Sequence, residues 1–221
     1  MMFADPPMIF ADSKVQAVFD RYREREAADM ERMRALGPEG FAIRDEFLLP
    51  IGEEAGRFLH ALILARRPAR ILELGTSYGY STLFLADAAH SVGARVVSMD
   101  LADYKQAFAR AMLEDAGLAG HVDFRLGDAV EMIGAESGPF DFVLLDIWKE
   151  LYLPCFEAFY PKLAEEGVIA ADNMIQPAMD RPEVRRFREA VRAKADLQTV
   201  LLPIGQGIEL AVKWSAGNDK L

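Results

Sequence analysis

The sequence has 221 residues, which is long for one small domain and short for two. Hydrophobic residues make up 52% of it and aromatic residues 10%, enough for a large core and against disorder. The net charge of −10 disfavours nucleic acid as a partner, because phosphate contacts need clustered Lys and Arg. No apolar run approaches the ~20 residues that span a bilayer. With no basic signal-peptide region and a single cysteine, Cys155, we expect a cytoplasmic protein without a membrane partner.

Two helices are expected before the first strand. Residues 13–36 form a charged amphipathic pattern that stops at Gly37-Pro38, and its apolar stripe is Val15, Val18, Phe19 and Tyr22. A second helix is expected over residues 53–66. We therefore expect one domain over residues 1–221, with an N-terminal helical extension of about residues 1–50. Two roles stay open for the first helix, namely covering the active site and forming a homodimer interface.

From Arg70 onward, short apolar runs alternate with helical patterns, which is typical of an α/β fold with helices on both faces of a mostly parallel sheet. The expected strands are 70–74, 95–100, 122–126, 141–145, 166–171, 197–202 and 207–213. The expected helices between them are 79–90, 104–117, 128–134, 149–163 and 182–194. The last two strands are joined by a link too short for a parallel crossover, so the final strand should run antiparallel. Seven strands with only the last reversed is the Rossmann-like arrangement of class I methyltransferases.

Polar groups follow the first three strands, at the edge where ligands bind in open α/β sheets. Gly75 and Gly79 form a G-x-x-x-G turn, which differs from the G-x-G-x-x-G of dinucleotide-binding folds. Asp100 ends the second strand, where a carboxylate can accept hydrogen bonds from ribose hydroxyls or cap the next helix. The same two interpretations stay open for Asp128 after the third strand.

The fourth and fifth strands both end in an aspartate, Asp146 and Asp172, and Asn173 follows the second of these. Two carboxylates and an amide oxygen form a hard ligand set suited to Mg²⁺, Mn²⁺ or Ca²⁺. Asp172 and Asn173 can converge on one ion only if the chain leaves the strand near Ala171. The alternative is that Asp146 caps a helix while Asp172-Asn173 is a polar turn.

Several of these segments resemble the cation-dependent S-adenosylmethionine O-methyltransferases of the catechol O-methyltransferase type. They are the stretch from Glu73 to Ser81, the acid Asp100, the turn Gly127-Asp128-Ala129, and the D-x-W-K-x-x-Y-L-P motif from Asp146 to Pro154. The resemblance covers roughly residues 46 to 214.

The resemblance implies a role for each matching residue. Contacts to S-adenosyl-L-methionine are implied for Leu49, Ile51, Glu73, Gly75, Ser77, Ser81, Asp100, Asp128, Ala129, Asp146 and Trp148. Asp146, Asp172 and Asn173 match metal ligands, and Lys149 matches the general base. Substrate contacts are implied for Phe47, Trp148, Lys149, Asn173, Pro177 and Glu209. Phe47 replaces a tryptophan of the family, and Glu209 is alternatively a surface acid on an edge strand.

The implied activity is transfer of the methyl group of S-adenosylmethionine to one hydroxyl of a Mg²⁺-chelated catechol or polyphenol. A caffeoyl-coenzyme-A-like O-methyltransferase is the first alternative, although it would need a basic patch for the coenzyme phosphates. A nicotinamide-dependent oxidoreductase is disfavoured by the missing G-x-G-x-x-G and by the terminal hairpin. A non-catalytic cofactor-binding module should have lost one of Asp146, Lys149, Asp172 or Asn173, and all four are present.

Overall fold

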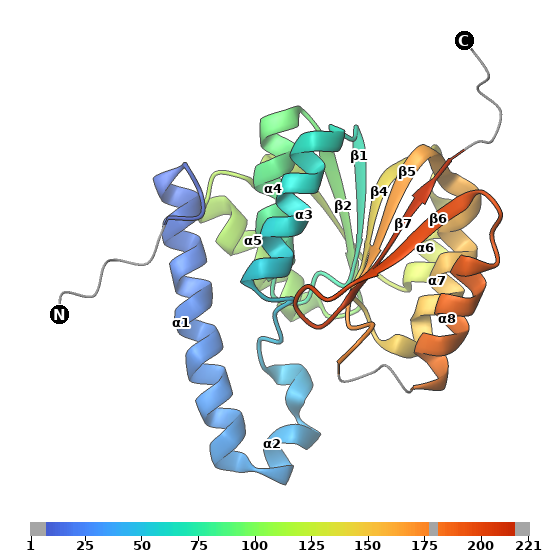
Figure 1. The fold of residues 1–221 in the computed structure, drawn as a ribbon. Coiled ribbons are helices and arrows are strands. Elements are labelled where there is room, and N and C mark those ends of the chain that lie inside the picture. The colour runs from blue at the N-terminus through green and yellow to red at the C-terminus, as the bar shows by residue number, and fades with distance from the viewer. Residues whose placement is uncertain (1–7, 177–180, 215–221) are drawn as a thin grey trace.

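A seven-stranded sheet forms the centre of the protein, in a computed structural model that describes residues 8–176 and 181–214 (Figure 1). The strand order is β3-β2-β1-β4-β5-β7-β6, and β7 runs antiparallel to both of its neighbours. The strands are β1 (Arg70–Leu74), β2 (Arg95–Asp100), β3 (Val122–Leu126), β4 (Phe140–Leu145), β5 (Leu163–Ala171), β6 (Leu197–Leu202) and β7 (Ile208–Lys213). This is the predicted fold class.

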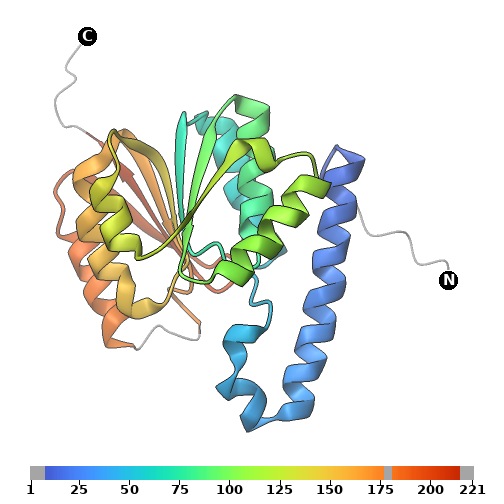
Figure 2. The same cartoon turned by 180° about the vertical axis from the view of Figure 1, so that it is seen from behind.

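Helices cover both faces of the sheet, as Figures 1 and 2 show from opposite sides. One face carries α3 (Glu53–Arg66), α4 (Tyr80–Val92) and α5 (Asp103–Asp115). The other face carries α6 (Ala129–Ala135), α7 (Tyr152–Phe159) and α8 (Pro182–Arg192). Single-turn 3₁₀ helices are η1 (Arg44–Glu46), η2 (Ala119–His121), η3 (Lys149–Leu151) and η4 (Tyr160–Lys162). Among the described residues, no helix combines the length and apolar character needed to cross a membrane.

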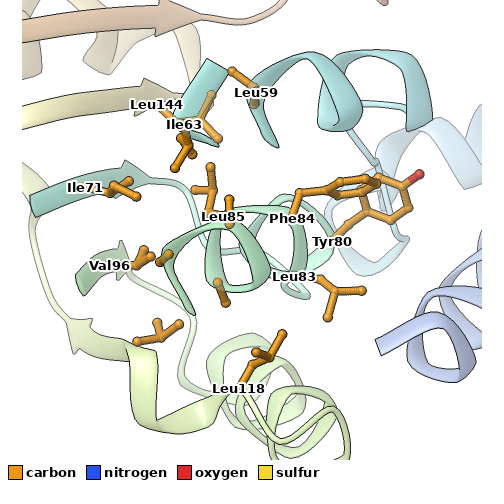
Figure 3. Close-up of a cluster of buried hydrophobic side chains, with 14 of the residues drawn as sticks. Leu59, Ile63, Ile71, Tyr80, Leu83, Phe84, Leu85, Val96, Leu118 and Leu144 are labelled. Atoms are coloured by element: carbon orange, nitrogen blue, oxygen red, sulfur yellow. The ribbon is translucent and has the colours of Figure 1, made fainter. Parts of the chain in front are cut away.

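The core on the α3–α5 face is made of aliphatic and aromatic side chains that leave almost no surface to water. Figure 3 shows Leu59 and Ile63 of α3 facing Leu144 and Ile71 of the sheet, with Leu85 of α4 between the layers. Each fully buried side chain of this size contributes about 1.5–3 kcal/mol to folding. This packing fixes the position of α4, whose N-terminus follows the Gly75 turn.

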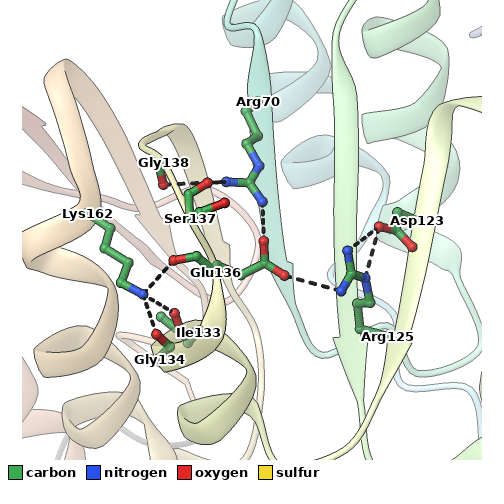
Figure 4. Close-up of polar contacts among 9 residues, drawn as sticks. All are labelled: Arg70, Asp123, Arg125, Ile133, Gly134, Glu136, Ser137, Gly138 and Lys162. Carbon is green, nitrogen blue, oxygen red and sulfur yellow. Dashed lines mark hydrogen bonds and ion pairs between the residues drawn. The ribbon is translucent and has the colours of Figure 1, made fainter.

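The opposite face has its own core, which includes the rings of Tyr152, Phe156 and Phe187. Polar contacts close it at the end of α6, as Figure 4 shows. Lys162 Nζ donates to the carbonyl oxygens of Ile133, Gly134 and Glu136, at 2.5, 2.7 and 2.8 Å. The Glu136 carboxylate pairs with Arg70 and Arg125 of β1 and β3. The lysine therefore adds hydrogen bonds to carbonyl groups at the C-terminal end of α6, where the intrahelical hydrogen bonds run out.

The N-terminal helix α1 (Ser13–Leu36) packs its predicted apolar stripe on the domain, and Arg21 adds an ion pair with Asp115 of α5. The rest of α1 extends beyond the sheet, and the short α2 (Pro38–Ala42) turns back beside it (Figures 1 and 2). At the base of this arm, the Tyr22 hydroxyl donates to the backbone oxygen of Tyr78 over 2.7 Å. The arm therefore contacts the turn after β1.

Most predicted elements are confirmed, within three residues at their ends, but two differ. The helix expected over 149–163 is divided into η3, α7 and η4, and β5 begins at Leu163 instead of residue 166. Pro161 ends the α-helical hydrogen bonding there, because proline has no backbone N–H to donate. The second difference is α2, which was not predicted, although its Pro38 is the residue expected to stop α1.

Candidate functional site

A cavity of about 420 Å³ lies at the carboxyl ends of β1, β2, β4 and β5. Ligand sites are common at this edge of an open α/β sheet. The structure brings together thirteen of the predicted site residues in the cavity wall, namely Phe47, Leu49, Ile51, Gly75, Ser77, Ser81, Asp100, Ala129, Asp146, Trp148, Lys149, Asp172 and Asn173. Glu73, Asp128 and Glu209 are not in the wall, and Pro177 lies outside the described residues.

Gly75 occupies a position that only glycine fits. Its φ is +100°, and a Cβ built on it would lie 2.0 Å from the backbone oxygen of Asp146. The turns after β1 and β4 are therefore pressed together, with the Asp146 N–H donating to Leu74 O over 2.9 Å. This contact brings the glycine turn and the chain around Lys149 to the same cavity.

Asp100 organises the turn after β1. Its carboxylate accepts hydrogen bonds from the backbone N–H of Ser77, at 2.7 Å, and of Ala102, at 2.8 Å. The N-cap position of α5 belongs to Ala102, so Asp100 is not the capping residue. The carboxylate nevertheless lines the cavity, where a ligand could reach it.

Asp128 caps a helix, which is one of the two roles predicted for it. It is the N-cap of α6, and its Oδ1 accepts a hydrogen bond of 3.0 Å from the backbone N–H of Glu131. Its neighbours Gly127 and Ala129 line the cavity, but Asp128 does not. A capping role is confirmed, and a cofactor contact of Asp128 stays a prediction.

Glu73 lies behind the cavity wall and is fully buried. It accepts hydrogen bonds from the hydroxyls of Ser81, Thr82 and Ser98, at 2.6, 2.7 and 2.5 Å. Burial raises the pKa of Glu73 to about 7, and these hydroxyl donors oppose part of that rise. Because Ser81 lines the cavity, Glu73 fixes the orientation of a wall residue.

Lys149 lies at the centre of the polar end of the cavity. Its Nζ donates to Asn173 Oδ1 and to the Tyr152 hydroxyl, both at 2.6 Å, and it lies 3.9 Å from Asp146 Oδ1. Burial lowers the pKa of Lys149, although the carboxylates of Asp146 and Asp172 oppose the shift. Tyr152 was not predicted as a site residue. Its signal in the sequence is the tyrosine of the D-x-W-K-x-x-Y-L-P motif, three residues after Lys149.

Asp172 supplies a buried carboxylate oxygen, Oδ1, that has no hydrogen-bond partner among the described residues. Burial first, and the carboxylate of Asp146 second, raise the pKa of Asp172 to about 8. Burial raises the pKa of Asp146 as well. The strand ends at Ala171 and Asn173 has a φ of +57°, so the chain turns where the shared ion site requires it, and Asp172 and Asn173 both line the cavity.

This donor set fits a hard divalent cation. Within residues 8–176 and 181–214, no three His, Cys, Asp or Glu side chains are placed to hold a metal ion, so the candidate set is two carboxylates and one amide. An unpartnered buried carboxylate oxygen is unfavourable by itself, and a cation beside it would offset that cost.

Aromatic rings line the remaining wall. Phe47 is buried, whereas Trp148 is 44% exposed. The Arg44 guanidinium lies 5.4 Å from the centre of the Trp148 ring, within range of a cation–π contact.

Glu209 lies elsewhere. Both of its oxygens accept hydrogen bonds of 2.9 Å, one from Arg188 and one from Arg192 of α8. The interpretation as a surface acid on an edge strand is wrong, because β7 lies between β5 and β6 and Glu209 is buried. Arg188 and Arg192 hold the Glu209 carboxylate outside the cavity wall. The contact between Glu209 and the substrate that the resemblance implies therefore stays a prediction.

Comparison with known proteins gives one consistent family. The family model described as O-methyltransferase matches residues 42–214. A probable O-methyltransferase of Mycobacterium tuberculosis is 34% identical over 66% of this chain, and the match covers 66% of that relative, just under two thirds of its length. A catechol O-methyltransferase of Niastella koreensis is 32% identical over 74% of this chain and 82% of its own. A caffeoyl-CoA O-methyltransferase of Petroselinum crispum is 28% identical over 74% of this chain and 76% of its own.

Solved structures agree with this result. The O-methyltransferase from Bacillus cereus, solved in complex with SAH, superposes with a TM-score of 0.71. It is 26% identical, and the superposition covers 93% of each chain. With its reversed last strand, its cavity at the carboxyl edge and a family match over most of its length, this chain belongs to the O-methyltransferase family.

Proposed function

We propose that the protein transfers the methyl group of S-adenosylmethionine to one hydroxyl of a catechol-like substrate chelated by a divalent cation, Mg²⁺ by preference. The observation that carries the proposal is the meeting of Asp146, Lys149, Asp172 and Asn173 in the cavity that the Gly75 turn also lines. Family membership supports the class of reaction.

The cofactor would occupy the part of the cavity beside β1 and β2. Supporting residues there are Gly75, Ser77 and Ser81 for the methionine and sulfonium region, Asp100 for the ribose and Ala129 for the adenine. The Bacillus cereus relative, which binds S-adenosylhomocysteine in its solved structure, supports this choice of cofactor.

Asp146, Asp172 and Asn173 would hold the cation. A divalent cation bound there lowers the pKa of a chelated hydroxyl and orients both oxygens of a vicinal diol. Two carboxylates with a combined charge of −2 match such an ion, and the unpartnered Oδ1 of Asp172 supports a ligand at that point.

Lys149 would act as the general base. An ordinary lysine has a pKa of ~10.4 and is a poor base at neutral pH, but burial lowers the pKa of this one. Asn173 and Tyr152 hold its Nζ in place. As the substrate oxygen forms its bond to the methyl carbon, the carbon–sulfur bond breaks and Lys149 takes the hydroxyl proton. Catalysis comes largely from this positioning.

Calorimetric titration with S-adenosylmethionine and with NAD tests the cofactor assignment. We expect S-adenosylmethionine to bind and NAD not to bind, and binding of NAD alone would contradict the proposal. Methyl transfer to 4-ethylcatechol and to caffeoyl-coenzyme A then compares the two substrate classes named in the relatives. Transfer to the coenzyme-A ester alone would favour the second class.

A further inference from the structure

Two arginines stand at the substrate end of the cavity, and the proposed chemistry uses neither of them. Arg44, in η1, lines the cavity wall beside Trp148. Arg181, the N-cap residue of α8, also lines this wall. We propose that Arg44 and Arg181 form an anion-binding subsite, and that the substrate is a catechol carrying a carboxylate. This inference rests on the proposed function and narrows its substrate class.

The position of Arg44 follows from its contacts. Its guanidinium lies 5.4 Å from the centre of the Trp148 ring and 4.8 Å from that of Phe41. Among the described residues, its Nη1 donates only to the backbone oxygen of Phe41, over 3.3 Å. The charge is therefore held over the exposed aromatic wall, where a ring bound against Trp148 would present its substituent.

Arg181 faces the same space. It lines the same cavity wall as Lys149 and Asn173. Arg181 is itself exposed to solvent. A small ligand could therefore reach its guanidinium without a rearrangement of the core.

Neither guanidinium pairs with a carboxylate in the part of the chain that the structure describes. The carboxylate next to Arg44 in sequence, Asp45, pairs instead with Lys105 Nζ at 2.5 Å. Several other arginines do have acidic partners, for example Arg21 with Asp115 and Arg66 with Glu166. Within the described residues, the rim of the cavity therefore carries two positive charges that pair with no carboxylate, on a protein with a net charge of −10.

These charges discriminate among catechols by the charge of the side chain. A carboxylate would be attracted by both arginines, and an ammonium group would be repelled by both. Coenzyme A is a less suitable source of the anion. Its several phosphates call for a larger basic surface, and the net negative charge of the protein opposes the approach of a polyanion.

The test compares three catechols of similar size under saturating S-adenosylmethionine and Mg²⁺: 3,4-dihydroxyphenylacetate, neutral 4-ethylcatechol and dopamine. We expect kcat/KM to decrease in that order. Arg44→Gln and Arg181→Gln should each reduce the preference for the acid over the neutral catechol about three-fold. The double variant should remove most of that preference, measured as the ratio of kcat/KM for the acid to kcat/KM for 4-ethylcatechol, so that a general loss of activity does not affect the result.

Arg186→Gln, an exposed arginine of α8 outside the cavity wall, is the matched control and should leave the preference unchanged. Calorimetry with S-adenosylhomocysteine present should also give weaker binding of the acid to the double variant. Methylation of 4-ethylcatechol with no preference for the acid would overturn the anion subsite and leave the proposed function standing. If Arg44 and Arg181 increase kcat/KM only for caffeoyl-coenzyme A, the anion that they bind is a phosphate of coenzyme A, and the proposal of a catechol carboxylate is wrong. If no catechol is methylated, both proposals fail.

Discussion

Lys149 is the residue on which the proposed chemistry depends most. Lys149→Ala should lower kcat about 100-fold or more, the usual range for loss of a general base. The Kd for S-adenosylmethionine should stay nearly unchanged, because the contacts of Nζ are to Asn173, Tyr152 and Ile147. Exposed Lys14, on α1, gives the control variant Lys14→Ala. Loss of cofactor binding in Lys149→Ala would assign Lys149 to the cofactor instead.

The pH dependence of the wild-type enzyme follows from the same residue. Only neutral Lys149 accepts a proton, so kcat should rise as pH increases through its pKa. Because burial lowers that pKa, the rise should occur below the range of an ordinary lysine. A kcat that shows no rise with pH at any pH below the pKa of a free lysine would contradict the base assignment, as would a fall.

Tyr152 is a positioning residue that links Lys149 to the end of β5. Its hydroxyl accepts from Lys149 Nζ at 2.6 Å and donates to the backbone oxygen of Asp172 at 3.1 Å. Tyr152→Phe keeps the ring that packs on Phe187 and removes only these two hydrogen bonds. We expect about a ten-fold fall in kcat, a displaced pH profile and little change in KM. An unchanged pH profile would mean that the hydroxyl serves the fold alone.

At the level of elements, η1 is fastened over the cavity by two contacts. Lys105 of α5 pairs with Asp45, and the Tyr78 hydroxyl donates to the backbone oxygen of Glu46 over 2.9 Å. Lys105→Met should loosen this attachment and raise the Kd for S-adenosylmethionine about three- to ten-fold, equivalent to about 1 kcal/mol. The control is Arg21→Met, which breaks an exposed pair between α1 and α5. If both variants raise the Kd for S-adenosylmethionine equally, the loss of any positive charge on α1 or α5 weakens binding, and the attachment of η1 is not the cause.

The end of α6 tests whether stability and activity can be separated. Lys162→Met removes three hydrogen bonds to carbonyl groups and keeps most of the side-chain volume (Figure 4). We expect the free energy of unfolding to fall by about 1–3 kcal/mol in chemical denaturation. Because Lys162 does not line the cavity, kcat should stay at the wild-type value. A lower kcat with unchanged stability would show that α6 transmits an effect to the site.

Across the whole molecule, the elements that could be predicted from sequence are those determined by the residues within or next to them. Most of β4 is the continuous apolar run 142–145, and the five-residue link before β7 requires an antiparallel return. The convergence of Asp146 and Asp172 follows because parallel neighbours end at one edge. The burial of Glu209 did not follow, because its partners Arg188 and Arg192 come from another element. The break in the helix at Pro161 was missed because the apolar period continues across it.

The central claim is that a divalent cation held by Asp146, Asp172 and Asn173 is required for methyl transfer. The most direct measurement is the initial rate of methyl transfer from S-adenosylmethionine to 4-ethylcatechol, before chelation with EDTA, after it, and after Mg²⁺ is restored. We expect EDTA to abolish turnover and Mg²⁺ to recover it, with no recovery in Asp172→Ala. A rate that EDTA leaves unchanged would contradict the claim.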